Sequence, residues 1–319
     1  MAKSPSSPTS YTAEFWQYDT RTIRRWNIDP VIKPGESTYA VFANNPIRLV
    51  DPNGANAGDY YSADTGKHIG SDGVNDGKNY IIEDSDYKSI TASCNKCTPA
   101  DIKTALAPAS KEISQPDLTK YQRLITSYND MIAKARSEGK TVAADLLQHF
   151  LDGTGTPMTL DGSWLRSNSA VTSAEERNKS RFNETIDEKY ETLNDGQSLT
   201  VKDYWDAMAT ASKFSELYYA SGTFTVRTTA EITLTRKGNI ITVMGTATIT
   251  WHDDYDWHAG LSAYIPGFGE VNDADALFLQ KYGKAKPFSM SSTWSNSVTG
   301  SIEIIDYWPD NNTVKWSLK

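Results

Sequence analysis

The densest group of side chains suited to acid–base or metal chemistry is the stretch "WHDDYDWHAG", residues 251–260. It holds two of the chain's four histidines and three aspartates. Because alternate side chains of an extended backbone point to the same side, one set is predicted to share a side: His252, Asp254, Asp256 and His258. This arrangement predicts an acid–base or metal cluster at a strand end, with the metal and cofactor unknown. The alternative is a solvated loop whose carboxylates accept hydrogen bonds from turn amides.

Two further acidic or histidine-containing groups lie elsewhere in the chain. His149 and Asp152 are three residues apart, so they share a face of a predicted helix, while Asp273 stands at the start of another. A histidine near a helix C-terminus and a carboxylate at an N-terminus also have simpler roles, as dipole partner and cap. If the three groups converge, they form one pocket lined by His149, Asp152, Asp254, Asp256, His258 and Asp273.

Asp253, Tyr255 and Asp256 fit the pattern Asp-x-Tyr-Asp. This pattern resembles the motif of colicin-M-like lipid II hydrolases. The resemblance implies a hydrolase with these three residues in its site. That family also carries a nearby His-Arg pair, which does not follow here.

Other catalytic signatures are absent from the sequence. It contains neither a Gly-x-Ser-x-Gly elbow nor a His-Glu-x-x-His zinc motif. Its two cysteines, Cys94 and Cys97, form one Cys-x-x-Cys pair. The pair is open to three interpretations: half of a zinc site, a redox or disulfide pair, or two loop thiols.

Composition and charge indicate which kinds of partner the chain is expected to bind. The 319-residue chain carries a formal net charge of -8 and no dense run of Lys and Arg, so nucleic acid is not an expected partner. No apolar stretch reaches the roughly 18–20 residues of a membrane span. The N-terminus lacks the apolar core of a signal peptide, which predicts synthesis in the cytoplasm without a leader.

Hydrophobic periodicity predicts helices in the middle of the chain and strands in its last third. Apolar residues recur three and four positions apart after Pro116 and again over 142–151. Capping boxes at Ser173–Glu176 and Thr200–Asp203 predict a third and a fourth helix, and a short acidic helix is expected at 274–282.

Alternation with period two predicts a β-hairpin around "RKGN". Its even-numbered apolar residues from Phe224 to Leu234 and odd-numbered ones from Ile241 to Trp251 are expected to face one core. A second hairpin is expected to turn at 309–312. The predicted fold class is α+β: a short β-rich N-terminal part, a helical segment, then a twisted antiparallel sheet.

The N-terminal residues "YDTRTIRRWNIDP" and "YAVFANNPIRLVDPNG" consist of short extended pieces broken by Asn, Pro and Gly turns. They resemble the closing segment of the Rhs/YD-repeat core of bacterial polymorphic toxins, through Tyr18, Asp19, Arg21, Arg25, Trp26, Asp29, Pro30, Tyr39, Asn44, Asn45, Pro46, Asp51, Pro52 and Gly54. The stretch that follows, "YYSADTGKHIGSDGVNDGKNYII", resembles the connector that joins such cores to variable toxin domains.

The resemblance implies a core remnant carrying C-terminal cargo. The expected organisation is a disordered segment at 1–10, core remnant and connector at 11–86, a linker at 87–115 and an α+β effector domain at 116–319. The implied function is a toxin secreted by a contractile injection system, either type VI or phage-tail-like, and acting as a hydrolase on the cell envelope or another essential target. The implied partners are the tube or spike of that apparatus and a cognate immunity protein. The alternative is a non-catalytic structural or adaptor protein of the injection particle.

Overall fold

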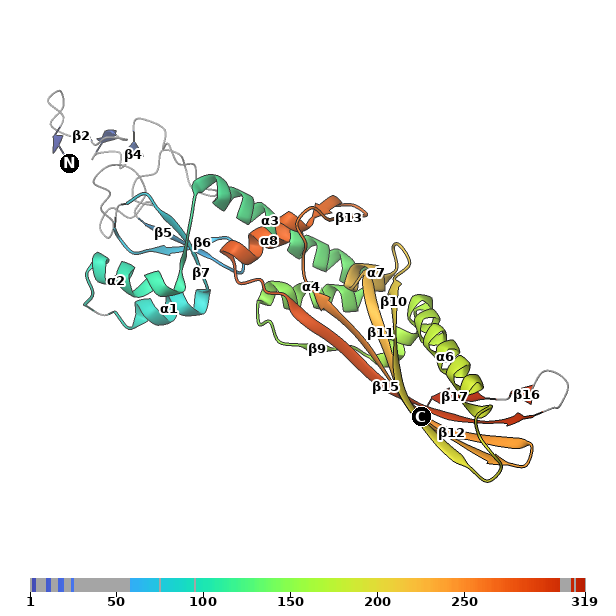
Figure 1. The fold of residues 1–319 in the computed structure, drawn as a ribbon. Coiled ribbons are helices and arrows are strands. Elements are labelled where there is room, and N and C mark those ends of the chain that lie inside the picture. Colours follow the sequence, from blue (N-terminus) through green and yellow to red (C-terminus); the bar gives the residue numbers. More distant parts are fainter. Residues whose placement is uncertain are drawn as a thin grey trace. The chain divides into compact units, whose positions relative to one another are not determined.

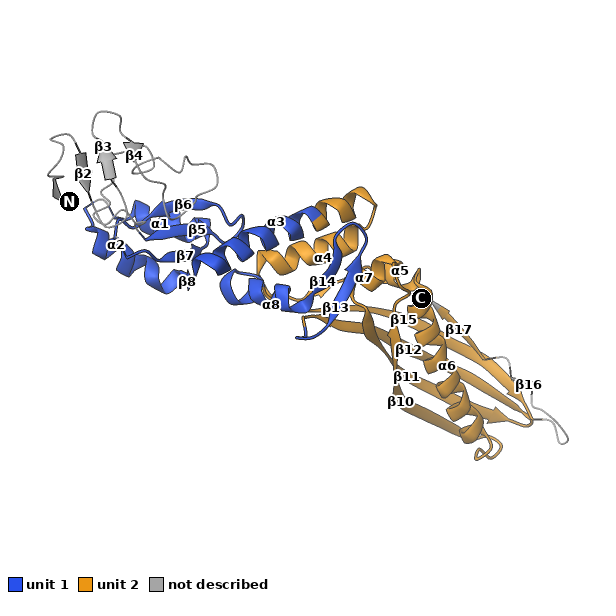
Figure 2. Ribbon diagram, turned by 90° about the horizontal axis from the view of Figure 1, so that it is seen from above, with its two compact units in different colours: residues 1–130, 258–285 blue, residues 131–257, 286–319 orange. Residues whose placement is uncertain are grey.

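The computed structural model describes residues 58–304 except 75 and 95, residues 311–312 and 314–318, and four short strands near the N-terminus. The chain divides into two compact units, coloured in Figure 2. Unit 1 comprises Met1–Asp130 and His258–Ala285, and unit 2 comprises Met131–Trp257 and Lys286–Lys319. Both contain helices and sheets, and antiparallel pairing predominates (Figure 1), which confirms the α+β class.

Of the segment that resembles an Rhs core, the structure describes four short strands: β1 (Ala2–Lys3), β2 (Ser10–Thr12), β3 (Gln17–Asp19) and β4 (Arg24–Arg25). They form an antiparallel sheet in chain order, in which Tyr18 pairs with Arg25. The other matching residues, from Arg21 and Trp26 to Gly54, lie outside the described residues.

The segment that resembles a connector contributes three strands to a small sheet with the strand order β6-β5-β7-β8, and β8 comes from farther along the chain. The strands of this sheet are β5 (Asp59–Ser62), β6 (His68–Ser71), β7 (Asn79–Ile82) and β8 (Lys111–Ile113). The aspartates of the connector serve as turn residues: Asp72 Oδ1 accepts from the Val74 N–H at 2.7 Å, and Asp76 Oδ1 accepts from the Lys78 N–H at 3.0 Å. Short polar side chains that accept from the backbone two residues on are typical of such turns.

Two helices and strand β8 occupy most of the segment predicted to be a linker, residues 87–115. They are α1 (Asp84–Ala92) and α2 (Pro99–Leu106). Their apolar side chains pack against Tyr60, Tyr80 and Ile82 of the small sheet: Tyr87, Ile90, Ile102 and Leu106. The segment is therefore part of a packed core.

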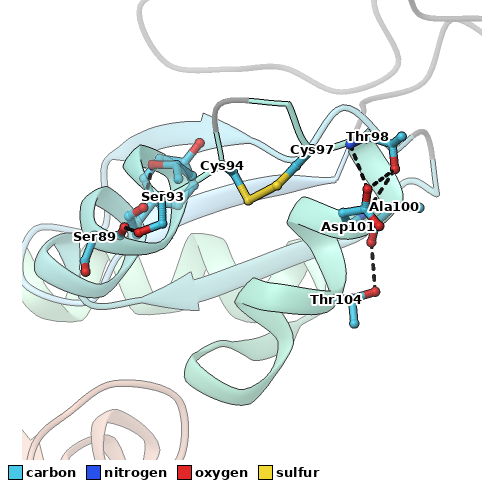
Figure 3. The surroundings of a disulfide bond; sticks show 10 residues. Ser89, Ser93, Cys94, Cys97, Thr98, Ala100, Asp101 and Thr104 are labelled. Atoms are coloured by element: carbon cyan, nitrogen blue, oxygen red, sulfur yellow. Dashed lines mark hydrogen bonds between the residues drawn. A yellow bond between two sulfur atoms is a disulfide. The ribbon is translucent and has the colours of Figure 1, made fainter.

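A disulfide bond between Cys94 and Cys97 joins the end of α1 to the start of α2 (Figure 3). Thr98 caps α2, accepting from the Asp101 N–H while the Asp101 carboxylate accepts from the Thr98 N–H at 2.9 Å. Of the three interpretations of the cysteine pair, the structure therefore supports the disulfide.

Unit 1 also holds the first part of α3 (Gln115–Ser137), the hairpin β13 (Ser262–Ile265) and β14 (Gly269–Asn272), and α8 (Asp273–Tyr282). The Tyr121 hydroxyl on α3 donates to the Ala63 carbonyl at 2.6 Å, and the Tyr282 hydroxyl donates to Asp117 at 2.9 Å. These bonds tie α3 to the connector and to α8. Both helices agree with the sequence prediction.

Unit 2 is built on a seven-stranded sheet with the core order β10-β11-β12-β15. These strands are β10 (Ser198–Thr210), β11 (Thr223–Lys237), β12 (Ile240–Tyr255) and β15 (Phe288–Glu303). Three short strands complete it by pairing with β15: β9 (Met158–Thr159), β16 (Asn311–Asn312) and β17 (Lys315–Leu318). The turn residues of the predicted C-terminal hairpin lie mostly outside the described residues.

Burial alternates along β11 and β12 as the sequence predicts. The even-numbered residues from Phe224 to Leu234 and the odd-numbered ones from Ile241 to Trp251 are buried on one face, with Gly245 half-buried. The register brings the two sets together, with Thr228 opposite Ile249 and Leu234 opposite Val243. The other face consists largely of Thr and Ser side chains. We call the first the helix face and the second the open face.

Helices pack on the helix face of the sheet and at one end of it, and the longest of them lies along the face (Figure 2). They are α4 (Thr141–Asp152), α5 (Gly162–Arg166), α6 (Ser169–Tyr190) and α7 (Glu216–Ala220). α4 and α6 confirm the second and third predicted helices, although α6 begins four residues before the expected Ser173 cap. In the described part of the chain, no helix is long and apolar enough to cross a membrane.

The fourth predicted helix is wrong. Thr200 and Asp203, interpreted as a capping box, lie inside strand β10, which pairs with β11 over thirteen residues. Val201, Tyr204 and Trp205 favour a strand, and the long pairing outweighs a local capping pattern. Only the five residues of α7 in this region are helical.

The alternation yields a matched pair of substitutions. Ile249 is fully buried, whereas its neighbour Thr248 is exposed on the open face. Ile249→Asp should unfold unit 2, because burying an unpaired carboxylate costs several kcal/mol, on the order of the whole stability of a domain. Thr248→Asp should cost about 1 kcal/mol or less. Thermal unfolding measures both, and equal small effects would contradict the register.

The disulfide should contribute modestly to stability. Cys94 and Cys97 are three positions apart, and closing so short a loop contributes about 2 kcal/mol in the chain-entropy description. Replacing both cysteines by serine should lower the unfolding free energy of unit 1 by about that amount. Dithiothreitol should reproduce the loss in the native chain and leave the double-serine variant unchanged. Complete unfolding of α1 and α2 on reduction would contradict the packing described above.

Candidate functional site

The sheet separates the residues of the 251–260 stretch onto its two faces. His252 and Asp254 point to the open face, where both are exposed. Asp253 and Tyr255 point to the helix face, where they are half-buried and buried. β12 ends at Tyr255, so the alternation does not extend to Asp256 and His258. The common side predicted for four residues is therefore observed for His252 and Asp254, and the extended backbone on which the prediction depended ends before Asp256 and His258.

Asp253 is the chemically distinctive residue of the stretch. Its Oδ2 accepts a hydrogen bond of 2.5 Å from the Ser221 hydroxyl. Burial raises the pKa of Asp253 to about 6, with a further contribution from the negative charges of Asp254 and Asp256. The hydrogen bonds from Ser221 and from the Asp254 N–H oppose this rise. A carboxyl group with this pKa can give up and recover a proton close to neutral pH.

Tyr255 and His149 meet an aromatic cluster at the same end of the helix face. The Tyr255 ring stacks on Phe288 with centroids 5.1 Å apart and lies 5.8 Å from Trp257. The imidazole of His149 contacts the edge of Phe288, with centroids 4.4 Å apart. Burial raises the pKa of Tyr255 above its usual range, so its hydroxyl stays protonated. The structure thus brings three predicted residues to one end of one face: Asp253, Tyr255 and His149.

His149 is held in place by the loop after α4. Its Nε2 lies 2.8 Å from the Thr156 carbonyl and 3.2 Å from the Thr154 hydroxyl. Gly153 caps the C-terminus of α4 with a φ of 68°, which suits glycine, and the chain turns there to bring the threonines back to the ring. Asp152 lies apart from the ring and accepts from the Gln148 amide at 2.9 Å.

His258 and Asp273 belong to unit 1. The Asp273 Oδ2 accepts from the His258 backbone N–H at 2.9 Å, at the first turn of α8. This role differs from the cap that the sequence left open for a carboxylate at a helix start, since α8 has no side-chain cap bond and Asp273 binds the backbone of another segment. Asp275, in the same turn, pairs with Lys120 at 2.9 Å.

Ser221 is the partner of Asp253 that the sequence analysis missed. It follows the short helix α7, which Glu216 fixes against α4: one carboxylate oxygen accepts from the Val142 N–H at 2.6 Å and the other from the Trp164 indole at 3.1 Å. No local motif marks Ser221, because its role depends on the pairing of elements far apart in the chain.

A buried polar network lies farther along the helix face. Glu175 on α6 is 1% exposed and accepts from the Asn296 amide at 2.9 Å, with Arg166 at 3.4 Å and Lys179 at 3.5 Å. Asn178 donates to the Val226 carbonyl and the Thr228 hydroxyl. Paired and hydrogen-bonded groups of this kind fix the position of a helix on a sheet. We therefore infer that this network fixes the position of α6 on the sheet.

Among the described residues, no group of three or more His, Cys, Asp or Glu side chains is placed to hold a metal ion. A groove of about 640 Å³ runs between α6 and the end of β10, lined among others by Ser173, Arg177 and Met208. None of the predicted site residues lines it. Comparison with protein-family models, curated proteins and solved structures finds no match to this chain.

The raised pKa of Asp253 predicts a pH-dependent cost in stability. Between its ordinary value of 3.8 and about 6, the folded state holds a proton that the unfolded state has lost, so stability falls as pH rises through this range. Asp253→Asn removes this cost and should stabilise unit 2 by about 1–2 kcal/mol at pH 7, with little gain at pH 4; contact with water limits the magnitude. Urea unfolding at the two pH values measures the difference. A stabilisation independent of pH would contradict the assignment.

Proposed function

We propose that unit 2 is the enzymatic domain of a secreted effector and that Asp253 is its catalytic acid–base residue. The observation that carries the proposal is the placement of Asp253, which is half-buried near the end of a strand and bonded to the Ser221 hydroxyl, where burial raises its pKa to about 6. A structural carboxylate gains nothing from a position that penalises its charge, whereas a general acid or base needs this tuning. The reaction class we propose is hydrolysis, in which Asp253 activates water or protonates a leaving group.

The neighbouring groups support a site at this position. The imidazole of His149 lies at the same end of the helix face, and the Tyr255 hydroxyl is a protonated donor. The cluster of Phe150, Tyr255, Trp257 and Phe288 provides apolar surface beside them. A small set of polar groups at the margin of an aromatic surface is the usual composition of a ligand site.

The biological setting of the proposal comes from the N-terminal resemblance. The resemblance to an Rhs-type core, followed by an α+β domain, favours cargo of a contractile injection system, type VI or phage-tail-like, that is made in the cytoplasm and secreted by that system. The tube or spike of that system and an immunity protein are the proposed partners. The target is the cell envelope or another essential structure.

A toxicity assay with a matched pair of variants tests the proposal. The chain is expressed in bacteria, once in the cytoplasm and once directed to the periplasm, as native protein, Asp253→Asn and Asp254→Asn. Asp254 is adjacent but points to the open face, so its variant controls for charge and position. Native protein and Asp254→Asn should be toxic in one compartment, and Asp253→Asn should lose toxicity by two orders of magnitude or more while remaining folded.

Two outcomes would contradict this function. Toxicity that survives Asp253→Asn would remove Asp253 from the mechanism. No toxicity in either compartment would favour the non-catalytic alternative, a structural or adaptor protein of the injection particle.

A further inference from the structure

Strand β10 forms one edge of the unit 2 sheet, since within the described residues only β11 pairs with it. Two hydrogen bonds, one beside each end of β10, fix which backbone groups face that edge. The Ala211 N–H donates to the Gly222 carbonyl and the Arg236 N–H donates to the Gln197 carbonyl, so odd-numbered residues at both ends of β10 face β11. Because N–H and C=O of one residue point to the same side and the side alternates, even-numbered residues face outward.

Two side chains confirm this direction by occupying the outward groups. The Arg177 guanidinium donates to the Met208 carbonyl at 2.6 Å, and the Asp203 carboxylate accepts from the Tyr204 N–H at 2.8 Å. Both partner residues are even-numbered. Natural edge strands are often blocked in this manner. Both contacts are exposed, and they occupy only two of the outward groups along the thirteen residues.

The outward edge also carries exposed apolar side chains. Tyr204 is 58% exposed and Met208 is 69% exposed, both on the open face. Aromatic and methionine side chains are enriched where protein surfaces bind one another. A long open edge beside such side chains favours association by strand addition.

We propose that β10 pairs with β10 of a second copy of this chain, antiparallel and centred on Tyr204, so that two sheets join into one. A two-fold axis at Tyr204 places Lys202 opposite Asp206 of the other copy, and Thr200 opposite Met208. All these residues have outward N–H and C=O groups, as the hydrogen-bonded pairs of an antiparallel ladder require.

We choose a second copy as the partner of β10 because the charges on the two facing strands are then complementary. Within one chain Lys202 pairs with Glu231 at 3.0 Å, and Asp206 receives a bidentate bond from Arg227 at 2.7 and 2.8 Å. In the joined sheet these pairs form a row of alternating sign across four strands: Glu231, Lys202, then Asp206 and Arg227 of the second copy. The two Tyr204 rings become a cross-strand aromatic pair.

The experiment measures the mass of the full chain in solution by light scattering, over the widest accessible concentration range. Native protein should form a dimer. Lys202→Asp and Asp206→Lys should each be monomeric, because each sets like charges opposite one another at both ends of the axis. An equimolar mixture of the two variants should restore a mixed dimer, because aspartates of one chain then face lysines of the other.

Two further variants complete the design. Glu231→Lys is the matched control, since it reverses a charge of the same face without touching the second copy, and it should remain dimeric. Tyr204→Pro removes one outward N–H but no bond to β11, so it should be folded and monomeric. A native chain that is monomeric at every concentration would overturn the proposal, as would dimers of both single charge variants or a mixture that stays monomeric.

Discussion

The alternation of apolar and polar residues along β11 and β12 is the constraint on which the rest of unit 2 depends. A slip of one residue in either strand would move every buried side chain to the open face. The register is fixed because the apolar residues of both strands must face the helices, among them Phe224, Ile232, Val243 and Ile249. The same constraint assigns each residue at the end of β12 to a face, and it alone separates Asp253 from its two neighbours.

This separation gives adjacent residues different chemistry. His252 and Asp254 are exposed among the threonines and serines of the open face. The Asp253 side chain lies on the helix face beside Ser221, where burial disfavours its charged form. The fold therefore bears an electrostatic cost at Asp253, and perturbed carboxylates of this kind cluster at functional sites.

Sequence patterns predicted the parts of the fold that repeat with a clear period. The hairpin of β11 and β12, the helices α3, α4 and α8, and the α+β class all follow from local periodicity. The fourth helix failed because Thr200 and Asp203 mimic a cap in a segment whose strand state depends on thirteen residues of pairing with β11. Part of the candidate site follows from the sequence, since Asp253, Tyr255 and His149 lie at one face of the sheet. The contact of Ser221 with Asp253 and the change from unit 2 to unit 1 after Trp257 depend on tertiary contacts, which residue spacing does not encode.

The ionisation of Asp253 is the central claim, and it can be observed directly. A pH titration of the side-chain carboxyl carbons by nuclear magnetic resonance, with Asp253 assigned by comparison with Asp253→Asn, reports its pKa in the folded protein. The account predicts a midpoint of about 6 for Asp253. A midpoint near the ordinary aspartate value of 3.8 would contradict it, because the carboxylate would then be an ordinary hydrogen-bonded group at the edge of the core.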